Sequence, residues 1–186
     1  MTRSFTGGPE VDRVVGWCAT ALRAPTAGFA QGVHMIVLSG DSLAEFWDVS
    51  GAGSWFAGVN EGVLAAPVVV VVGGRIGPYL ERYGSPDKAG HGLEVESGWP
   101  VPFWLTDAAM AAQNLLLLVE EARLGALFFG LFRNVDAVAR RLGAPDDFRP
   151  VGAIAIGGRS DSDRSSGSPS RRPRLADGEL VHLGTW

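Results

Sequence analysis

The side chains best suited to holding a ligand gather in one short segment near the N-terminus, residues 23–32. It reads Arg-Ala-Pro-Thr-Ala-Gly-Phe-Ala-Gln-Gly. Pro25 and the two glycines end a helix and leave few bulky side chains, so backbone N–H groups are accessible to a ligand. Thr26 adds a hydroxyl and Gln31 adds an amide. Such a loop can hold a flat or a phosphorylated molecule, and it can equally be an ordinary turn between a helix and a strand.

The rest of the chain offers little acid–base or metal chemistry. The three histidines lie far apart, and none is spaced as a ligand pair with Cys, Asp or Glu. No nucleophile signature is present. The glycines that follow residues 68–72 depart from the dinucleotide-binding spacing, and a proline comes soon after them. We therefore predict no metal site and assign no catalytic side chain. The pattern favours chemistry that a cofactor carries.

Composition predicts one globular domain on the apolar side of the usual range. The chain has 186 residues, of which 46% are hydrophobic and 19% are charged. A net charge of −4 and a pI near 5.3 do not indicate the excess of positive charge that binds nucleic acid or an anionic membrane. Two apolar runs stand out, residues 63–72 and 114–132. The first is too short for a membrane span and the second carries charged residues at its centre. The first residues lack an apolar signal core, so a cytoplasmic protein is expected.

The segments around the loop carry alternating helix and strand patterns. An apolar stripe predicts a helix over 11–22, and 33–38 is typical of a buried strand. Asp41 is expected to cap the next helix. Further helices are expected over 54–64, 78–83 and 134–143, and further strands over 67–72 and 150–156. This irregular mixture predicts an α+β or α/β layered domain.

Thr106 is expected to cap the longest helix, residues 107–124. Between Ala108 and Val119 this helix is apolar on nearly every face, so it needs cover on all sides. A small domain rarely surrounds a helix completely. We therefore expect a homodimer with this helix at the interface, the alternative being a helix central to a monomer.

Two other segments of the chain have no regular pattern. Residues 84–104 form a loop long enough to be a lid or a binding segment. Residues 157–173 are rich in Ser, Gly, Arg and Asp and are predicted to be a mobile loop. An apolar C-terminal arm, 174–186, would complete a single domain over 1–186.

Several motifs, taken in chain order, resemble those of the FMN-dependent nitroreductase family. Residues 23–31 are similar to its Ala-Pro-Ser-x-x-Asn-x-Gln-Pro signature, with Phe29 in place of the asparagine and Gly32 in place of the final proline. Arg3-Ser4-Phe5-Thr6 resembles the end of its opening Arg-x-Ser-x-Arg-x-Phe motif. Asn60 resembles the asparagine that lies near the flavin.

The resemblance continues through the second half of the chain. The helix from Thr106 looks like the family's central dimer helix, and 124–131 looks like the segment over the flavin. Arg171-Arg172-Pro173 and the closing residues 181–186 resemble its C-terminal arginine motif and arm. The resemblance therefore spans essentially the whole chain.

The resemblance implies a three-layer α-β-α domain with a mixed, mainly antiparallel central sheet, paired into a homodimer around the long central helix. It implies one FMN per subunit at the interface and hydride transfer from NAD(P)H, through the flavin, to a small organic acceptor. Two alternatives of the same fold stay open: a deazaflavin in place of FMN, and a non-catalytic protein that binds or sequesters flavin.

The resemblance also assigns roles to individual residues. Arg3 and one of the two C-terminal arginines would pair with the phosphate, and Asn60 would bind the polar edge of the flavin ring. The full set expected at the cofactor is Arg3, Ser4, Pro25, Thr26, Gln31, Asn60, Phe128, Phe129, Gly130, Arg171 and Arg172.

Overall fold

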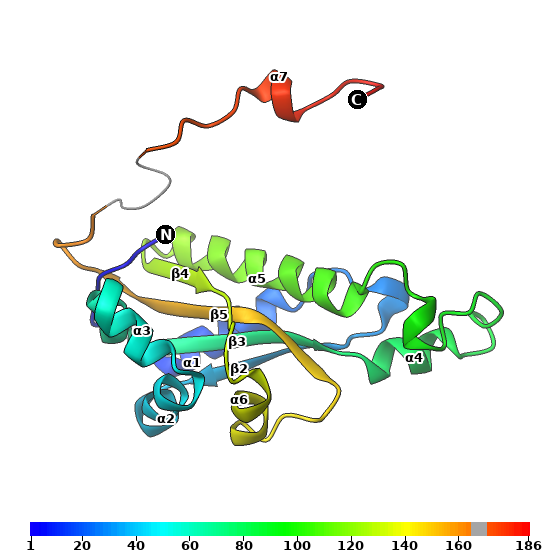
Figure 1. Ribbon diagram of the computed structural model, residues 1–186, viewed down its shortest axis with the longest axis horizontal. Helices are drawn as coiled ribbons and strands as arrows, with labels where there is room; N and C mark the ends of the chain where they lie inside the picture. The colour runs from blue at the N-terminus through cyan, green and yellow to red at the C-terminus, as the bar shows by residue number, and fades with distance from the viewer. Residues whose placement is uncertain (165–170) are drawn as a thin grey trace.

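A five-stranded sheet lies between two layers of helices in the computed structural model, which describes residues 1–164 and 171–186 (Figure 1). The strands are β1 (Phe5–Thr6), β2 (Val33–Leu38), β3 (Val68–Arg75), β4 (Gly125–Phe129) and β5 (Phe148–Arg159). The order is β1-β5-β3-β2, and β4 also pairs with β5. Every pairing among the described strands is antiparallel, so the sheet has no parallel component there.

Within the described residues, six helices and three short 3-10 turns connect these strands, and a seventh helix follows the last strand. The helices are α1 (Val11–Ala21), α2 (Gly40–Ser50), α3 (Ala52–Val59), α4 (Gly77–Tyr83), α5 (Phe103–Glu121), α6 (Val135–Arg141) and α7 (Asp177–Leu180). The turns are η1 (Ala27–Phe29), η2 (Glu61–Ala65) and η3 (Glu96–Gly98).

The valine run in β3 shows why the fold has three layers. Side chains alternate across a strand, so Val68, Val70 and Val72 pack with α1 and α5, while Val69 and Val71 pack with α2, α3 and α6. All five valines are almost completely buried. A strand that is apolar on both faces must be covered on both faces. The predicted α+β fold with three α-β-α layers is confirmed.

Two predicted helix caps are wrong. α2 begins at Gly40, one residue before Asp41, because Ser39 precedes it and the Ser39 N–H donates to the Ser42 hydroxyl at 3.2 Å. α5 begins at Phe103, because the Pro102 carbonyl accepts the N–H groups of residues 105 and 106. Thr106 therefore lies inside the first turn of α5, where its hydroxyl donates to a main-chain carbonyl at 3.2 Å.

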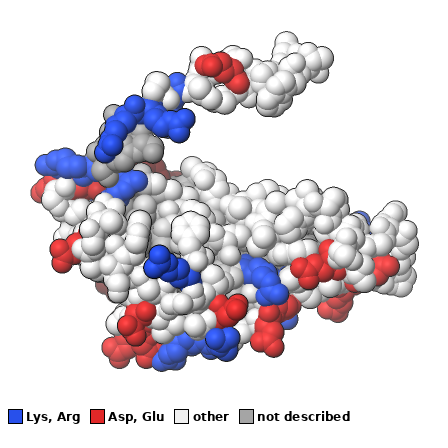
Figure 2. Space-filling view, viewed as in Figure 1, with Lys and Arg blue, Asp and Glu red and all other residues white. Residues whose placement is uncertain are grey.

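Within one chain, the long helix α5 is buried along one face only, so the rest of the cover predicted from its sequence does not come from the described residues of this chain. Ala108, Ala111 and Leu115 have no exposed surface, whereas Met110 is 41% exposed and Leu117 is 58% exposed. Figure 2 shows few charged side chains over the middle of α5, while Lys, Arg, Asp and Glu gather along the opposite edge, over α2 and α6. This helix therefore presents an apolar, uncharged strip to solvent.

The C-terminal part of the chain leaves the layered body. β5 continues to Arg159, three residues into the segment predicted as a loop from residue 157, because it pairs there with β1. Residues 165–170 of that predicted loop lie outside the described residues. Residues 171–186 are exposed along their whole length and run out from the body (Figure 1). In the described part of the chain, no helix has the length and apolar character needed to cross a membrane.

Candidate functional site

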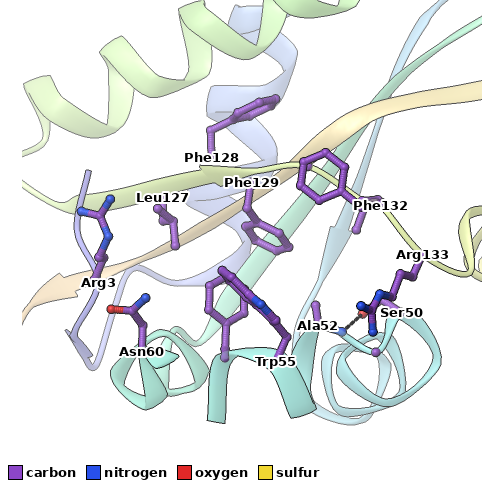
Figure 3. Close-up of a pocket in the computed structure, with 14 residues that line it drawn as sticks. Arg3, Ser50, Ala52, Trp55, Asn60, Leu127, Phe128, Phe129, Phe132 and Arg133 are labelled. Carbon is purple, nitrogen blue, oxygen red and sulfur yellow. Dashed lines mark hydrogen bonds between the residues drawn. The ribbon is translucent and has the colours of Figure 1, made fainter. Parts of the chain in front are cut away.

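A cavity of about 450 Å³ opens between α3, β4 and the N-terminal segment. It brings together five residues that three separate motifs placed at a flavin: Arg3, Asn60, Phe128, Phe129 and Gly130. Figure 3 shows the Arg3 guanidinium and the Asn60 amide at one end and Phe129 beside Trp55 along the wall, whereas the Phe128 side chain points to the other side of β4. The volume lies within the range of ordinary small-molecule sites.

The N-terminal segment is held so that Arg3 reaches this cavity. Gly62, in η2, has no Cβ, and one placed there would lie 2.8 Å from the Ser4 Cα. The Asp163 carboxylate accepts the N–H groups of Arg3 at 2.8 Å and of Ser4 at 3.1 Å. These contacts fix the backbone of the segment on both sides. The Arg3 side chain can then extend beside Asn60.

An aromatic cluster forms the floor of the cavity. Phe129 stacks on Trp47 with ring centroids 5.8 Å apart, and Phe56 meets its edge at 5.2 Å. Trp47 comes from α2, Phe56 from α3 and Phe129 from β4, so three separate elements meet in this cluster, and Phe56 and Phe129 line the cavity. Gly130 continues the wall beyond β4, since a Cβ there would lie 2.5 Å from the Phe132 ring. The glycine therefore keeps room beside that ring.

The loop that carries Pro25, Thr26 and Gln31 lies elsewhere in the molecule. It packs against α4, which Figure 1 shows at the other end of the sheet from α3. None of its residues lines the cavity. The Arg82 guanidinium donates to the Gly28 carbonyl at 2.8 Å, which ties the loop to α4. Within one chain, the two parts of the predicted flavin site are thus separate.

A buried carboxyl group holds this loop in place. Asp107 is 1% exposed, and its Oδ2 accepts the Ala27 N–H and the Tyr79 hydroxyl, both at 2.8 Å. Burial, together with the bond to Asp107, raises the pKa of Tyr79, so this hydroxyl remains a donor. One side chain of α5 therefore joins the loop to α4.

The loop backbone is strained. Phe29 has φ 60° and Gln31 has φ 53°, values in the left-handed region that non-glycine residues seldom adopt. The Thr26 hydroxyl accepts the Gln31 N–H at 3.1 Å, and the Phe29 side chain is 74% exposed. Strain of this kind persists only where surrounding contacts enforce it, and it is common at ligand sites.

The remaining predicted residues do not line the cavity. The Ser4 hydroxyl lies 2.9 Å from that of Ser162, beside the turn that holds Asp163. Arg171 and Arg172 are exposed in the segment outside the body.

Several residues that line the cavity were not predicted from the sequence. Trp55 and Phe56 precede Asn60 on α3, and Phe132 and Arg133 follow β4. Phe132 is 93% exposed, which is unusual for a large aromatic side chain. Aromatic side chains four and five positions before the asparagine, and an Arg after an aromatic run, were the available signals.

The cavity suits a flat, largely apolar ligand with one polar edge. Among the described residues that line it, none is Asp or Glu, and the polar side chains are few. It can bind and orient a molecule through Arg3 and Asn60 and exclude water through its aromatic floor. It offers no side chain suited to act as general acid or base.

Comparison with known proteins identifies the family of this chain. The family model described as the nitroreductase family matches residues 13–158, which is most of the chain. The chain belongs to the nitroreductase family. This confirms the resemblance that the motifs indicated.

Individual nitroreductase-family relatives are distant. The chain is 32% identical over 83 residues to an FMN reductase (NADPH) of Bacillus subtilis, a match covering 44% of the chain and 31% of that protein. The chain thus spans about a third of the length of this relative. Among solved structures, it is similar to NfrA1 of B. megaterium, with TM-score 0.74, 19% identity, and coverage of 100% of this chain and 70% of that one.

A second solved structure, from Exiguobacterium sibiricum, is in complex with FMN. The TM-score is 0.70 at 14% identity, with coverage of 98% of this chain and 91% of that chain. At these identities the structural likeness establishes the fold only.

Proposed function

We propose that this protein is an FMN-dependent oxidoreductase that takes hydride from NAD(P)H and passes it to a small organic acceptor. The observation that carries the proposal is the cavity, in which Arg3, Asn60 and the Phe128–Gly130 segment converge. These residues were expected at a flavin from motifs far apart in the sequence. Membership of the nitroreductase family, from which those motif assignments were taken, also supports flavin chemistry.

The cavity residues fit the flavin ring. The Asn60 amide can hydrogen-bond the polar edge of the ring, and the Arg3 guanidinium, expected at the phosphate, lies at the same end of the cavity. The flat apolar part of the ring needs aromatic walls, which Phe129 and its neighbours supply. When bound, FMN supplies the hydride chemistry, and the protein supplies binding, orientation and exclusion of water.

We propose further that the working site is completed by a second copy of the chain. The loop with Thr26 and Gln31 lies near the start of α5, whereas β4 and the cavity lie near its end. A two-fold axis crossing the middle of α5 would place the loop of one copy beside the cavity of the other. The exposed apolar strip with Met110 and Leu117 is the surface such a contact would cover.

The visible absorption spectrum of the protein, purified without added cofactor and after incubation with FMN, tests the flavin proposal. We expect a flavin spectrum that bleaches when NADH or NADPH is added without oxygen. Asn60→Ala should weaken FMN binding about tenfold through the lost hydrogen bond, while Ser54→Ala, on the exposed side of α3, should not. A protein that ignores FMN would refute the proposal, and bound flavin inert to both nicotinamides would favour the sequestering role.

Sedimentation tests the dimer. We expect a dimer at micromolar concentration, and Leu117→Glu should shift it to monomer by placing a charge in the apolar strip. A wild-type monomer that nevertheless binds FMN tightly would show that the loop is not needed from a second copy.

A further inference from the structure

The end of the cavity away from Arg3 and Asn60 carries a second cation, Arg133. Figure 3 shows it beyond Phe132, next to the turn formed by Ser50 and Ala52. Nothing in the family motifs assigned this residue. The proposed flavin contacts also leave it without a role, because they involve Arg3, Asn60 and residues 128–130.

Four arginines of the described chain pair with carboxylates, and Arg133 is not one of them. Arg75, Arg82, Arg141 and Arg159 each pair with an Asp or a Glu. Arg133 makes no ion pair with any described residue, and no carboxylate among the described residues lines the cavity with it. Its positive charge is therefore available to a ligand.

The backbone around Arg133 is fixed. The Asn134 side chain donates to the Val49 carbonyl at 3.0 Å, which ties this segment to the end of α2. Asn134 also has a left-handed backbone, with φ 53°, a conformation that asparagine tolerates better than most residues. Ser50 is 4% exposed, and its hydroxyl accepts the Ala52 N–H at 3.2 Å. These hydrogen bonds hold the backbone next to Arg133 in place.

Exposed aromatic rings lie between the two cationic ends. Trp55 is 58% exposed and Phe132 is 93% exposed, and both line the cavity. Rings of this kind can cover the flat part of an aromatic molecule. A guanidinium beyond them can form a bidentate pair with a carboxylate.

We propose that Arg133 is the anion-binding end of an acceptor subsite, and that the acceptor is a flat aromatic molecule bearing a carboxylate or a similar anionic group. Calling this molecule the acceptor rests on the proposed flavin function. The preference of the site for an anionic aromatic molecule does not depend on flavin. It narrows the acceptor from any small organic molecule to an acidic aromatic one.

Calorimetric titration with a matched pair of probes tests the subsite. 4-Nitrobenzoate and 4-nitrobenzamide have nearly the same shape and differ in charge. Because Arg133 is exposed, we expect the protein as purified to bind 4-nitrobenzoate up to about fivefold more tightly, as a solvent-exposed charge pair would give. Arg133→Gln should abolish this preference and leave the affinity for the amide unchanged within about twofold.

Two further variants separate the role of Arg133 from general charge effects. Arg133→Lys should keep part of the preference, because lysine retains the charge without the planar fork. Arg140→Gln, on exposed α6 and outside the cavity, should leave both affinities unchanged. Equal affinity of the wild type for both probes, or a preference that survives Arg133→Gln, would overturn the subsite.

The flavin content of each sample, read from its visible spectrum, distinguishes the two proposals. Anion preference in a protein that cannot bind flavin would support the subsite and count against the oxidoreductase. Anaerobic reduction by NADH and by NADPH identifies the source of the anion. If Arg133→Gln slows reduction by NADPH while 4-nitrobenzoate still binds, the cation serves the reductant and the acceptor proposal is wrong.

Discussion

Replacing Asp107 with Ala tests whether the strained loop is held from α5. The wild-type carboxyl accepts two hydrogen bonds of 2.8 Å, from the Tyr79 hydroxyl and the Ala27 N–H. Tyr79 has no exposed surface, so its hydroxyl would lose its partner in a place that water reaches poorly. An unpaired buried donor costs about 1–3 kcal/mol. With two donors affected, we expect Asp107→Ala to lower the free energy of unfolding by about 3 kcal/mol.

Urea unfolding of a double-mutant cycle measures this coupling. Tyr79→Phe removes one donor and should cost about 1 kcal/mol. The double variant should cost at least about 1 kcal/mol less than the sum of the two, because Asp107→Ala no longer leaves a buried hydroxyl unpaired. Asp107→Asn serves as the control, since its amide oxygen can accept both bonds. Additive costs, or a loss below about 1 kcal/mol for Asp107→Ala, would refute the reasoning.

Three other outcomes follow from the structure. Cys18 is buried, which raises its pKa from 9.0 to about 11; it should resist a thiol reagent at pH 8 in the native protein but not in urea. Because the unfolded thiol ionises first, unfolding free energy should fall between pH 9 and 11, and Cys18→Ala should lack this slope. Gly74→Ala would press a Cβ onto the main chain of α5 and should cost about 2 kcal/mol in urea unfolding, whereas Gly16→Ala, in open space on α1, should stabilise by about 0.5–1 kcal/mol. Asp163→Ala should weaken FMN binding by releasing the backbone that places Arg3, and Asp163→Asn should restore it, as spectral titration would measure.

The layers of the fold could be predicted because both faces of the central strands are apolar. An uninterrupted β-branched run such as Val68–Val72 has only one stable environment, between two layers. The edge strand β4 was not assigned, because its aromatic residues suit a strand and a helix equally well. Its pairing with β5 decides the matter, and that contact is not visible in local sequence.

The helix boundaries show where local signals compete. Thr106 and Asp41 are good capping residues. The N-cap positions are nevertheless occupied by Pro102, four residues before Thr106, and by Ser39, two residues before Asp41. A sequence pattern identifies residues able to cap a helix but not which of two neighbours does so.

For the candidate site, motifs from separate parts of the sequence named some residues that the structure brings together. Arg3, Asn60 and Phe129 meet in one cavity although they are far apart in the sequence. Trp55 and Arg133 also line it, and neither belongs to a motif. Their contribution depends on how α3 and the turn after β4 are placed, which only the folded chain determines.

The separation of the loop from the cavity gives α5 two roles that depend on each other. Asp107 on its buried face fixes the strained loop, and Met110 and Leu117 on its exposed face form the strip expected to meet a second copy. If that copy completes the flavin site, a change at Asp107 alters both the shape of the loop and the surface beside the interface. FMN affinity and dimer affinity should then fall together in Asp107→Ala, whereas Asn60→Ala should reduce FMN affinity while the apo dimer stays intact. That difference between the two variants would locate the loop at the neighbouring cavity rather than at its own.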